Sequence, residues 1–287
     1  MANFGVIILN YIEYQVTIDC VRDFLKQEQA GRTEIIVVDN ASPNDSFQKL
    51  ATTFKDVSNV TVVKSESNQG FANGNNLGYF KLLEIMVPDF VIFSNSDILL
   101  PEQGLYQWIL DCYTKYHFGV LGPSIYSVNA SFYQNPIPNL SKDINVIKKS
   151  IRDIRISLAK VALKKWLHSR KGKISVNIWE NTDFNEFHDD LTLHGAFQIM
   201  SKDYFEKYCE AYDTGTFLYY EENLLKLRCD KYALPMIYSP NYKVEHLQSF
   251  STNSETVNIN NKNYNRIKNS LQSLKRYLQV LKELEDD

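Results

Sequence analysis

Thr33 to Asp39 reads TEIIVVD, a β-branched apolar run that ends in a carboxylate. Such a run is typical of a strand that is buried on both faces. Phe4 to Leu9 (FGVIIL) has the same character, and Val16 to Leu25 between the two runs has the spacing of a helix. A strand, a helix and a second strand in this order predict a βαβ unit and a parallel sheet.

The same alternation continues along the chain after Asp39. Helices are expected over Ser46 to Phe54 and Asn75 to Met86, and strands over Val60 to Lys64 and Asp89 to Ser94. The predicted fold class is therefore α/β, with a mostly parallel, Rossmann-like central sheet flanked by helices.

Length and composition exclude several classes of protein. The 287 residues are nearly twice the roughly 150 residues of one typical domain, which predicts one large α/β unit or a core with an appendage. With 44% hydrophobic, 23% charged and 13% aromatic residues, the chain is not disordered, collagen-like or a highly charged tail protein.

The cysteines and the apolar runs bear on the compartment. Four widely separated cysteines form no C-x-x-C pair, which argues against a zinc ribbon or a thioredoxin-type centre and fits a reduced compartment; they are Cys20, Cys112, Cys209 and Cys229. No apolar run approaches the roughly 20 residues that span a bilayer, and Val6 to Leu9 lacks the length and basic flank of a signal peptide. A cytoplasmic protein is expected, with contact to a membrane surface left open.

Polar residues follow three of the expected strands. They are Asn10-Tyr11, Asp39-Asn40-Ala41-Ser42 and Asn95-Ser96-Asp97. In open parallel sheets ligands bind outside the carboxyl ends of the strands, so these residues predict a polar crevice of nucleotide size. The alternative is that Asn, Asp and Ser are common turn formers.

The segment Asn68 to Gly78 (NQGFANGNNLG) is the most specific motif of the chain. It is neither a G-x-G-x-x-G fingerprint nor a P-loop. Together with VVDNAS (Val37 to Ser42), it resembles the inverting family 2 glycosyltransferases of the GT-A fold, in particular the rhamnosyltransferase-like branch.

Further segments continue the resemblance in the same order, so that it covers roughly residues 4 to 251. SNSD (Ser94 to Asp97) is similar to the D-x-D-like metal motif of that family. The others are Gly122-Pro123, LHGAF with Gly195-Ala196, FLYYEENLLKLR (Phe217 to Arg228) and VEHLQSFS (Val244 to Ser251).

The resemblance implies a nucleotide-sugar donor whose diphosphate is bridged by Mg²⁺ or Mn²⁺. Asp97 is the expected metal ligand and His246 the second, although Asn95 stands where a strict D-x-D motif has its first acid. The resemblance places a uracil or thymine base at Asp39, and Gly70 and Gly74 would let the backbone approach the nucleotide. The expected donor site comprises Asn10, Asp39, Asn40, Asp45, Gly70, Phe71, Asn75, Asn95 and Asp97.

These assignments have structural alternatives. Asp97 would also suit a turn after a strand, His246 a structural histidine, and the two glycines tight turns.

Inverting transfer needs a carboxylate that takes the proton of the attacking hydroxyl. The resemblance aligns Glu222 with the family's base, and Glu221 is expected to support it. Leu224 replaces the second acid of the motif. The acceptor side is expected at Gly195, Ala196, Tyr220 and Arg228. The alternative for the glutamates is an acidic helix start that complements the helix dipole.

Charge is segregated along the chain. Lys142 to Ser175 contains eleven basic and two acidic residues, against 31 and 34 in the whole chain, so a segment of +9 is set against −12 elsewhere. Its apolar residues follow helical spacing from Ile144 through Ile147, Ile151, Ile154 and Leu158 to Val161.

Ile144 to Lys173, including Trp166, is therefore expected to dock as an amphipathic helix on an anionic membrane. Packing of its stripe on the core or in a homodimer is the alternative. No nucleic-acid partner is expected.

The predicted organisation is a catalytic domain over residues 1–251, with a basic helical insertion at about 142–175, and a helical extension over 252–287. The expected function is transfer of a sugar from a UDP- or dTDP-sugar to a glycan or lipid-linked acceptor in cell-surface polysaccharide biosynthesis, at the inner face of the cell membrane. A non-catalytic nucleotide-sugar-binding or scaffolding protein of the same fold is the alternative. A nucleotidyltransferase is disfavoured because no Gly-rich, basic triphosphate loop lies near the first strand.

Overall fold

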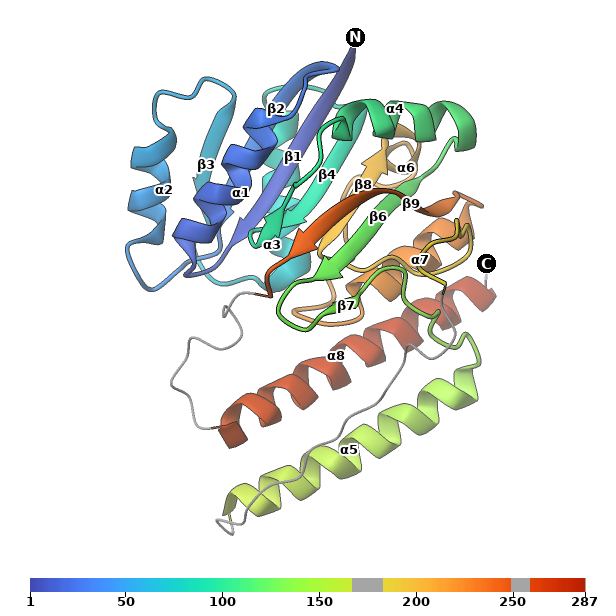
Figure 1. Cartoon of the computed structure of the whole chain (residues 1–287). Helices are drawn as coiled ribbons and strands as arrows, with labels where there is room; N and C mark the ends of the chain where they lie inside the picture. The colour runs from blue at the N-terminus through green and yellow to red at the C-terminus, as the bar shows by residue number, and fades with distance from the viewer. Residues whose placement is uncertain (167–182, 249–258, 287) are drawn as a thin grey trace.

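The computed structural model describes residues 1–166, 183–248 and 259–286, which form one sheet and the helices packed around it (Figure 1). The strands are β1 (Ala2–Asn10), β2 (Gly31–Asp39), β3 (Val60–Lys64), β4 (Phe90–Asn95), β5 (Ile98–Leu99), β6 (Val120–Ser127), β7 (Phe132–Tyr133), β8 (Phe197–Ser201) and β9 (Met236–His246). The helices are α1 (Tyr14–Lys26), α2 (Ser46–Phe54), α3 (Gly70–Leu83), α4 (Leu105–Tyr116), α5 (Ile144–Trp166), α6 (Lys202–Phe205), α7 (Glu221–Lys231) and α8 (Ile259–Asp286).

The sheet has the order β3-β2-β1-β4-β8-β6-β9-β5, with β7 paired to β6. The ladders β3-β2-β1-β4 and β6-β9 are parallel, whereas β8 runs antiparallel to both β4 and β6. As a result, β9 ends at the same edge of the sheet as β1, β2 and β4. The predicted α/β class with a mostly parallel central sheet is confirmed.

Helices cover both faces of the sheet because consecutive side chains of a strand point to opposite faces. Phe4, Val6 and Ile8 of β1 pack in one core with α1, α2 and α4. Ile7, on the other face, packs in a second core with α3, α6 and α7. Both faces of β1 are therefore buried, which explains its continuous apolar sequence.

Helix α3 begins at Gly70, whereas the sequence predicts a helix from Asn75. The Asn/Gly motif thus lies inside the first turns of α3. Asparagine and glycine are poor helix formers, so tertiary contacts of the motif, described below, stabilise this part of the helix.

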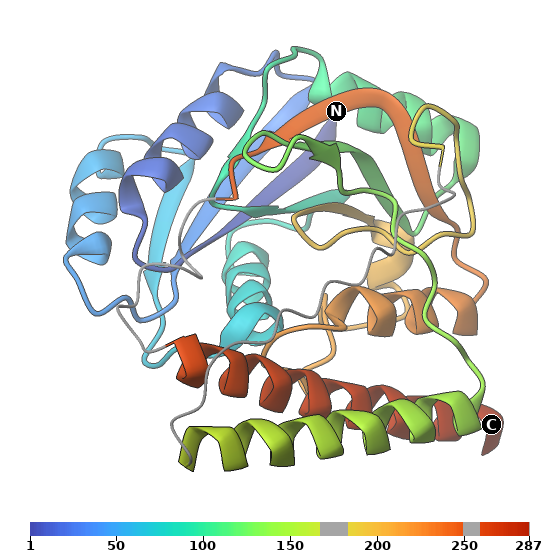
Figure 2. The ribbon, with the colours of Figure 1, turned by 60° about the horizontal axis from the view of Figure 1, so that its bottom comes forward.

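Helices α5 and α8 lie side by side beneath α7 as a third layer (Figures 1 and 2). Ile147 and Ile151 of α5 share a buried cluster with Leu274 and Tyr277 of α8 and Leu227 of α7. The apolar stripe is therefore covered within the chain. This corrects the expectation that the stripe enters a membrane and supports the alternative of packing on the core.

The rest of the predicted basic helix, from residue 167 to Lys173, lies outside the described residues, as do residues 252–258 of the predicted extension. On the outward side of α5, Lys148, Lys149, Arg152 and Arg155 are exposed.

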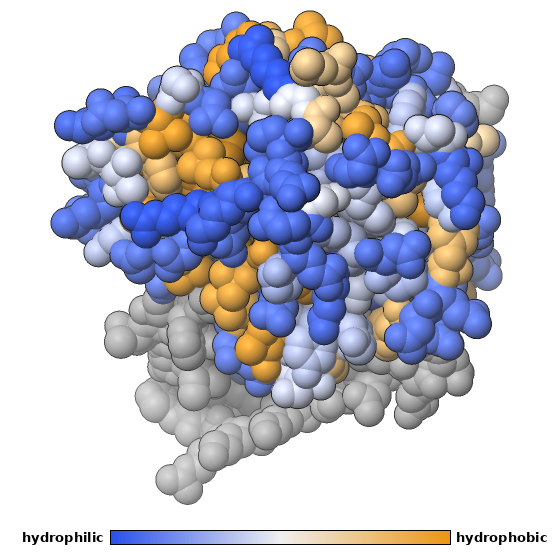
Figure 3. Space-filling view, turned by 45° about the horizontal axis from the view of Figure 1, so that its top comes forward, coloured by the Kyte–Doolittle hydropathy of each residue, from blue (hydrophilic) through white to orange (hydrophobic). Residues whose placement is uncertain are grey.

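Among the described residues, no helix is both long enough and apolar enough to cross a membrane. On the face shown in Figure 3, hydrophobic side chains gather in separate patches among hydrophilic ones.

Candidate active site

Six of the predicted residues lie at the carboxyl ends of β1, β2, β4 and β9 or directly after them. We call this set the strand-end rim: Asn10, Asp39, Asn40, Asn95, Asp97 and His246. The topology brings them to one edge of the sheet although they span most of the chain, as expected for a parallel α/β site.

Asn10 and Asp39 form a closed pair at one end of the rim. They are partners in the β1–β2 register, and Asn10 Nδ2 donates a 2.8 Å hydrogen bond to Asp39 Oδ2. Asp39 Oδ1 accepts from the backbone N–H of Ser42 at 3.0 Å, and both side chains of the pair are fully buried. The expected direct contact of Asp39 with a base is therefore not open in this conformation. The carboxylate anchors the loop after β2 instead.

Asn40 joins the end of β2 to the start of α3. Its Nδ2 donates to the carbonyl of Gly70 at 3.0 Å, and its Oδ1 accepts from the N–H of Gln69 at 3.0 Å. Asp45 lies exposed at the start of α2, 3.9 Å from Lys49. Of these two predicted donor residues, Asn40 holds the loops together and Asp45 faces solvent.

The glycines of the Asn/Gly motif make room for protein atoms. Gly70 has φ +76°, and a Cβ there would lie 2.1 Å from the carbonyl oxygen of Phe217. A Cβ on Gly74 would lie 2.6 Å from Leu9. Asn75 is buried and donates to the carbonyl of Phe71 at 3.0 Å. Protein atoms therefore surround these residues, and their contact with a nucleotide stays a prediction.

Asp97 and His246 meet because β5, directly after Asp97, pairs antiparallel with the end of β9. His246 Nε2 lies 3.2 Å from Asp97 Oδ1, and each side chain is 9% exposed. His246 Nδ1 lies 2.7 Å from Gln134 Oε1. An amide oxygen only accepts hydrogen bonds, so Nδ1 donates and Nε2 faces the carboxylate.

A second histidine borders this pair. The ring of His194 lies 6.1 Å from that of His246. Burial, with a further contribution from His246, lowers the pKa of His194 to about 4. Its Nδ1 accepts a hydrogen bond from the N–H of Ala196. His194 is therefore neutral near pH 7, and it adds no positive charge beside His246.

The segment from His194 to Ala196 connects the rim to α7. The carbonyl of Ala196 accepts a 2.8 Å hydrogen bond from the N–H of Asn95. A Cβ built on Gly195 would lie 3.6 Å from Phe71 Cζ and 4.0 Å from Glu222 Oε2. The structure thus brings Phe71, Gly195 and Glu222 together, while Ala196 itself is buried.

Glu221 and Glu222 open helix α7 directly after a strained turn. Tyr219 and Tyr220 have φ of 77° and 67°, a conformation that costs a non-glycine residue about 1–3 kcal/mol. Glu221 is 5% exposed, and its Oε1 has no hydrogen-bond partner among the described residues. Burial and the neighbouring Glu222 raise the pKa of Glu221 to about 8. Burial also raises the pKa of Glu222, which is only partly buried by area.

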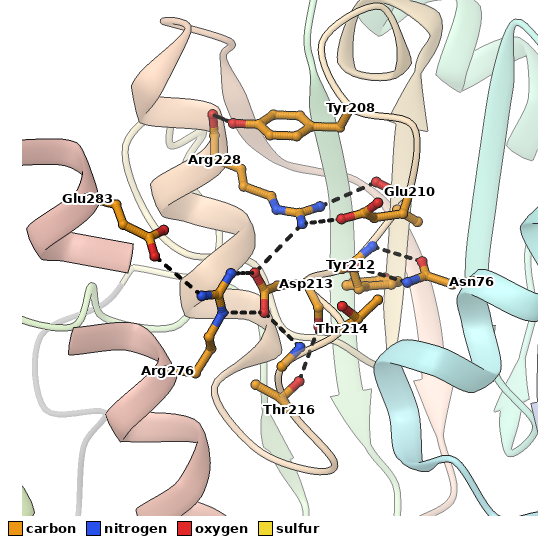
Figure 4. Close-up of polar contacts among 12 residues, drawn as sticks. Asn76, Tyr208, Glu210, Tyr212, Asp213, Thr214, Thr216, Arg228, Arg276 and Glu283 are labelled. Atoms are coloured by element: carbon orange, nitrogen blue, oxygen red, sulfur yellow. Dashed lines mark hydrogen bonds and ion pairs between the residues drawn. The ribbon is translucent and has the colours of Figure 1, made fainter. Parts of the chain in front are cut away.

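Arg228 and Tyr220 make contacts with other parts of the chain. Arg228 lies 2.8 Å from Glu210 Oε1, 3.7 Å from Asp213 Oδ2 and over the ring of Tyr208 (Figure 4). Tyr220 packs against the cluster of α5, α7 and α8. Arg228 thus belongs to a buried ion-pair network and Tyr220 is partly buried against a hydrophobic cluster, while their place on the acceptor side stays a prediction.

The chemistry of Asp97 and His246 fits Mg²⁺ or Mn²⁺, which accept oxygen and imidazole ligands. The contact with Gln134 resembles the second-shell hydrogen bond that orients a metal-binding histidine. Within residues 1–166, 183–248 and 259–286, no group of three or more His, Cys, Asp or Glu side chains is arranged to hold a metal. Further ligands would have to come from substrate oxygens and water, as is common for Mg²⁺.

Sequence reasoning missed several residues that shape the site. His194 lies inside the quoted LHGAF segment, but nothing local shows that its ring borders His246. Gln134 and Phe217 act through contacts with residues more than a hundred positions away. Only YDTG, from Tyr212 to Gly215, carried a local signal, since Asp and Gly are both typical turn residues.

Comparison with solved structures shows the same fold. S. aureus TarS 1–349 in complex with UDP-GlcNAc is 14% identical with a TM-score of 0.58, over 97% of this chain and 66% of that one. The same fragment with UDP is 13% identical with a TM-score of 0.56, over 91% and 68%. GalNAc-T7 with UDP, GalNAc and Mn²⁺ is 14% identical with a TM-score of 0.60, over 93% and 47%.

No curated protein matches the chain. The family model described as glycosyl transferase family 2 matches residues 5–209. This match includes the Asn/Gly motif, the SNSD segment and the LHGAF segment, and it spans well over half of the 287 residues. The chain therefore belongs to glycosyl transferase family 2.

Proposed function

We propose that this chain transfers a sugar from a nucleoside-diphosphate sugar to a hydroxyl group of a glycan or lipid-linked acceptor, with inversion at the transferred carbon. The observation that carries the proposal is that one short segment, His194-Gly195, adjoins both groups. The ring of His194 lies 6.1 Å from that of His246, and a Cβ on Gly195 would lie 4.0 Å from Glu222 Oε2. A pair suited to a diphosphate-bound cation and a carboxylate suited to a hydroxyl proton thus flank this segment.

In the proposed reaction, the acceptor oxygen attacks the anomeric carbon of the donor. The bond between that carbon and the diphosphate oxygen breaks, and the nucleoside diphosphate leaves with the electron pair. Glu222 takes the proton of the attacking hydroxyl as general base. Glu221, which is protonated at neutral pH because its pKa is raised to about 8, leaves the negative charge of the pair on Glu222.

Asp97 and His246 would hold Mg²⁺ or Mn²⁺, which stabilises the charge that develops on the leaving diphosphate. Gln134 keeps the Nε2 of His246 turned toward Asp97. Phe71 and Gly195 border the space between this pair and Glu222. Asn10 and Asp39 orient the loop after β2, and Asp45 lies exposed near that loop.

The donor class is proposed from two observations. The solved structures with the same fold carry UDP or UDP-GlcNAc in TarS, and UDP, GalNAc and Mn²⁺ in GalNAc-T7. The Asn/Gly motif resembles the rhamnosyltransferase-like branch. We therefore propose a UDP- or dTDP-linked hexose or deoxyhexose, used in cell-surface polysaccharide biosynthesis.

The proposed catalytic unit covers residues 1–251, and α8 belongs to a helical extension.

We also propose that the outward face of α5 meets an anionic membrane surface at the inner side of the cell membrane. The exposed Lys148, Lys149 and Arg155 form no ion pair with another described residue, so their charge is available to a partner. Each such residue contributes about 1 kcal/mol near an anionic surface.

A non-catalytic nucleotide-sugar-binding protein is the second candidate, favoured by Asn95 in place of an acid and by Leu224, which is buried in the helical cluster. Release of UDP or dTDP from a panel of sugar donors, with Mn²⁺ and with chelator, separates the two. Acceptor-stimulated release supports the transferase. Donor binding without release from any donor supports the second candidate.

A further inference from the structure

The glutamate pair of the proposed active site depends on a segment that two helices hold from opposite sides. Residues 213–220, which we call the presenting segment, run from Asp213 to the residue before Glu221. The segment ends in Tyr219 and Tyr220, both with positive φ. Strained backbone of this kind persists only where surrounding contacts fix it.

Helix α3 holds one side of the presenting segment. The N–H of Phe71 donates to the carbonyl of Phe217 at 2.9 Å. Just before the segment, Asn76 Nδ2 donates to the carbonyl of Tyr212 at 2.9 Å, and Asn76 Oδ1 accepts from the Tyr212 N–H at 3.0 Å. The two hydrogen bonds to Tyr212 explain why the motif has a buried asparagine at Asn76.

Helix α8 holds the other side. Arg276 donates to both oxygens of Asp213, from Nε at 2.9 Å and from Nη2 at 2.8 Å (Figure 4). Asp213 Oδ1 also accepts from the N–H of Gly215 at 2.9 Å. At the far end, Ser273 Oγ donates to the carbonyl of Leu218 at 3.0 Å. Two residues of α8 thus fix both ends of the presenting segment.

The fit around Arg276 is close and largely buried. Asp213 is 7% exposed, and Ser273 is fully buried. A Cβ on Gly215 would lie 2.7 Å from Arg276 Cδ, so glycine is needed where the arginine side chain crosses the segment. A bidentate arginine–carboxylate pair fixes orientation as well as distance.

We infer that α8 is a positioning element for the glutamate pair, with Arg276 and Ser273 holding the presenting segment in the conformation that sets Glu222 beside Gly195. The inference rests on the proposed function for the role of Glu222. Helix α8 begins at residue 259, beyond the residues that the family model matches. The positioning contacts are therefore supplied by a part of the chain outside that match.

The test compares Arg276→Gln, Arg276→Lys and Ser273→Ala with the control Lys275→Gln, an exposed charge on the same helix. We expect Arg276→Gln to lower kcat roughly ten- to a hundredfold, because small displacements of a reacting group have effects of this size. The donor KM should stay the same. Arg276→Lys should restore part of kcat, Ser273→Ala should have a smaller effect, and Lys275→Gln none.

Amide hydrogen exchange of the peptide that covers residues 213–224 gives a readout that does not need turnover. Exchange should rise in Arg276→Gln and not in Lys275→Gln, while the peptide of α2 stays unchanged in both. Unchanged exchange and unchanged kcat in Arg276→Gln would overturn the inference and leave the proposed function intact. If no donor is turned over by the native chain, the proposed function fails, and the exchange result alone decides whether α8 holds the segment.

Discussion

The strand-end rim and the start of α7 present carboxylates in opposite settings. In the rim, Asp97 lies 3.2 Å from His246, and Asp39 accepts hydrogen bonds from Asn10 and Ser42. At the start of α7, Glu221 and Glu222 adjoin each other, and one buried oxygen of Glu221 has no partner in the part of the chain that the structure describes. The rim compensates its charges with neighbouring groups, whereas the helix start concentrates two acids.

This difference between the rim and the start of α7 indicates two different roles for their carboxylates. A carboxylate that neighbouring groups contact in this way suits the binding of a cation or the anchoring of a loop. A carboxylate with a raised pKa accepts a proton near neutral pH, which suits a general base. The following predictions test this division, from the largest expected effect to the smallest.

Glu222→Gln should abolish transfer, because the amide cannot take the proton of the acceptor hydroxyl. We expect a loss of roughly 10²–10⁴-fold in turnover, the usual contribution of a general base. Donor affinity, measured by titration with a UDP-sugar that the native chain turns over, should stay the same.

The matched control is Glu206→Gln, an exposed glutamate at the end of α6. It should retain full activity. Native turnover in Glu222→Gln would remove Glu222 from the base role and with it the contrast between the two regions.

The sequence predicted the first of these regions better than the second. Strand ends follow directly from apolar runs such as TEIIVVD, because a buried parallel strand has a local signature. The polar residues after those runs were therefore placed at the correct edge. What the local pattern lacks is the environment of each side chain, so the burial of Asp39 and the crowding of Gly70 by Phe217 were not predicted.

The sequence also did not predict in which direction individual side chains of a helix point. Arg228 follows Glu222 in the same helix, and the motif alone does not show that it turns toward Glu210 and Asp213. The pair of Asp213 and Arg276 joins residues 63 positions apart. Such contacts depend on how helices pack, which no pattern within α7 or α8 encodes.

Asp97→Asn tests the rim half of the comparison. The substitution removes the charge that would hold Mg²⁺ or Mn²⁺, so donor affinity with Mn²⁺ should fall by at least about tenfold, the lower range for disturbed metal sites. With chelator, the native chain and the variant should bind the donor equally weakly. If chelator leaves the donor affinity of the native chain unchanged, Asp97 is not a metal ligand.

Gly195→Ala tests whether the acceptor passes beside Gly195, which lies next to Phe71 and Glu222. The added methyl would lie in ordinary contact with Phe71 and Glu222, so the fold should tolerate it and the Tm should not change. It would nevertheless fill space beside the proposed base, and we expect turnover to fall about tenfold through a displaced acceptor. A variant with native turnover would show that the acceptor does not pass Gly195.

Glu221→Gln tests the uncompensated setting through stability. The pKa of Glu221 is about 8 in the folded chain against 4.5 ordinarily, so between these pH values only the folded chain keeps the proton. The free energy of unfolding must therefore fall as pH rises from 4.5 to about 8 and stay level above.

The glutamine variant cannot ionise, so above pH 8 it should unfold at a Tm several degrees higher than the native chain. The gain is on the order of a few kcal/mol, since each pKa unit corresponds to about 1.4 kcal/mol. Below pH 4.5 the two Tm values should coincide. If the Tm of the native chain does not change between pH 4.5 and about 8, the pKa of Glu221 is not raised in the folded chain.

Lys148→Gln extends the comparison to Lys148, Lys149 and Arg155 of α5, which form no ion pair with another described residue. The lysine is exposed, whereas Ile147 and Ile151 of the same helix pack in the cluster with α8. Binding to vesicles with anionic lipid should weaken about fivefold, equivalent to about 1 kcal/mol for one cation. Transfer to a soluble acceptor should not change, because the lysine is not part of the proposed active site. Lys55→Gln, an exposed lysine at the end of α2, is the control and should leave vesicle binding unchanged. If Lys148→Gln and Lys55→Gln weaken vesicle binding equally, the net charge of the protein sets the affinity, and not the exposed face of α5. If the native chain does not bind the vesicles, α5 has no membrane partner.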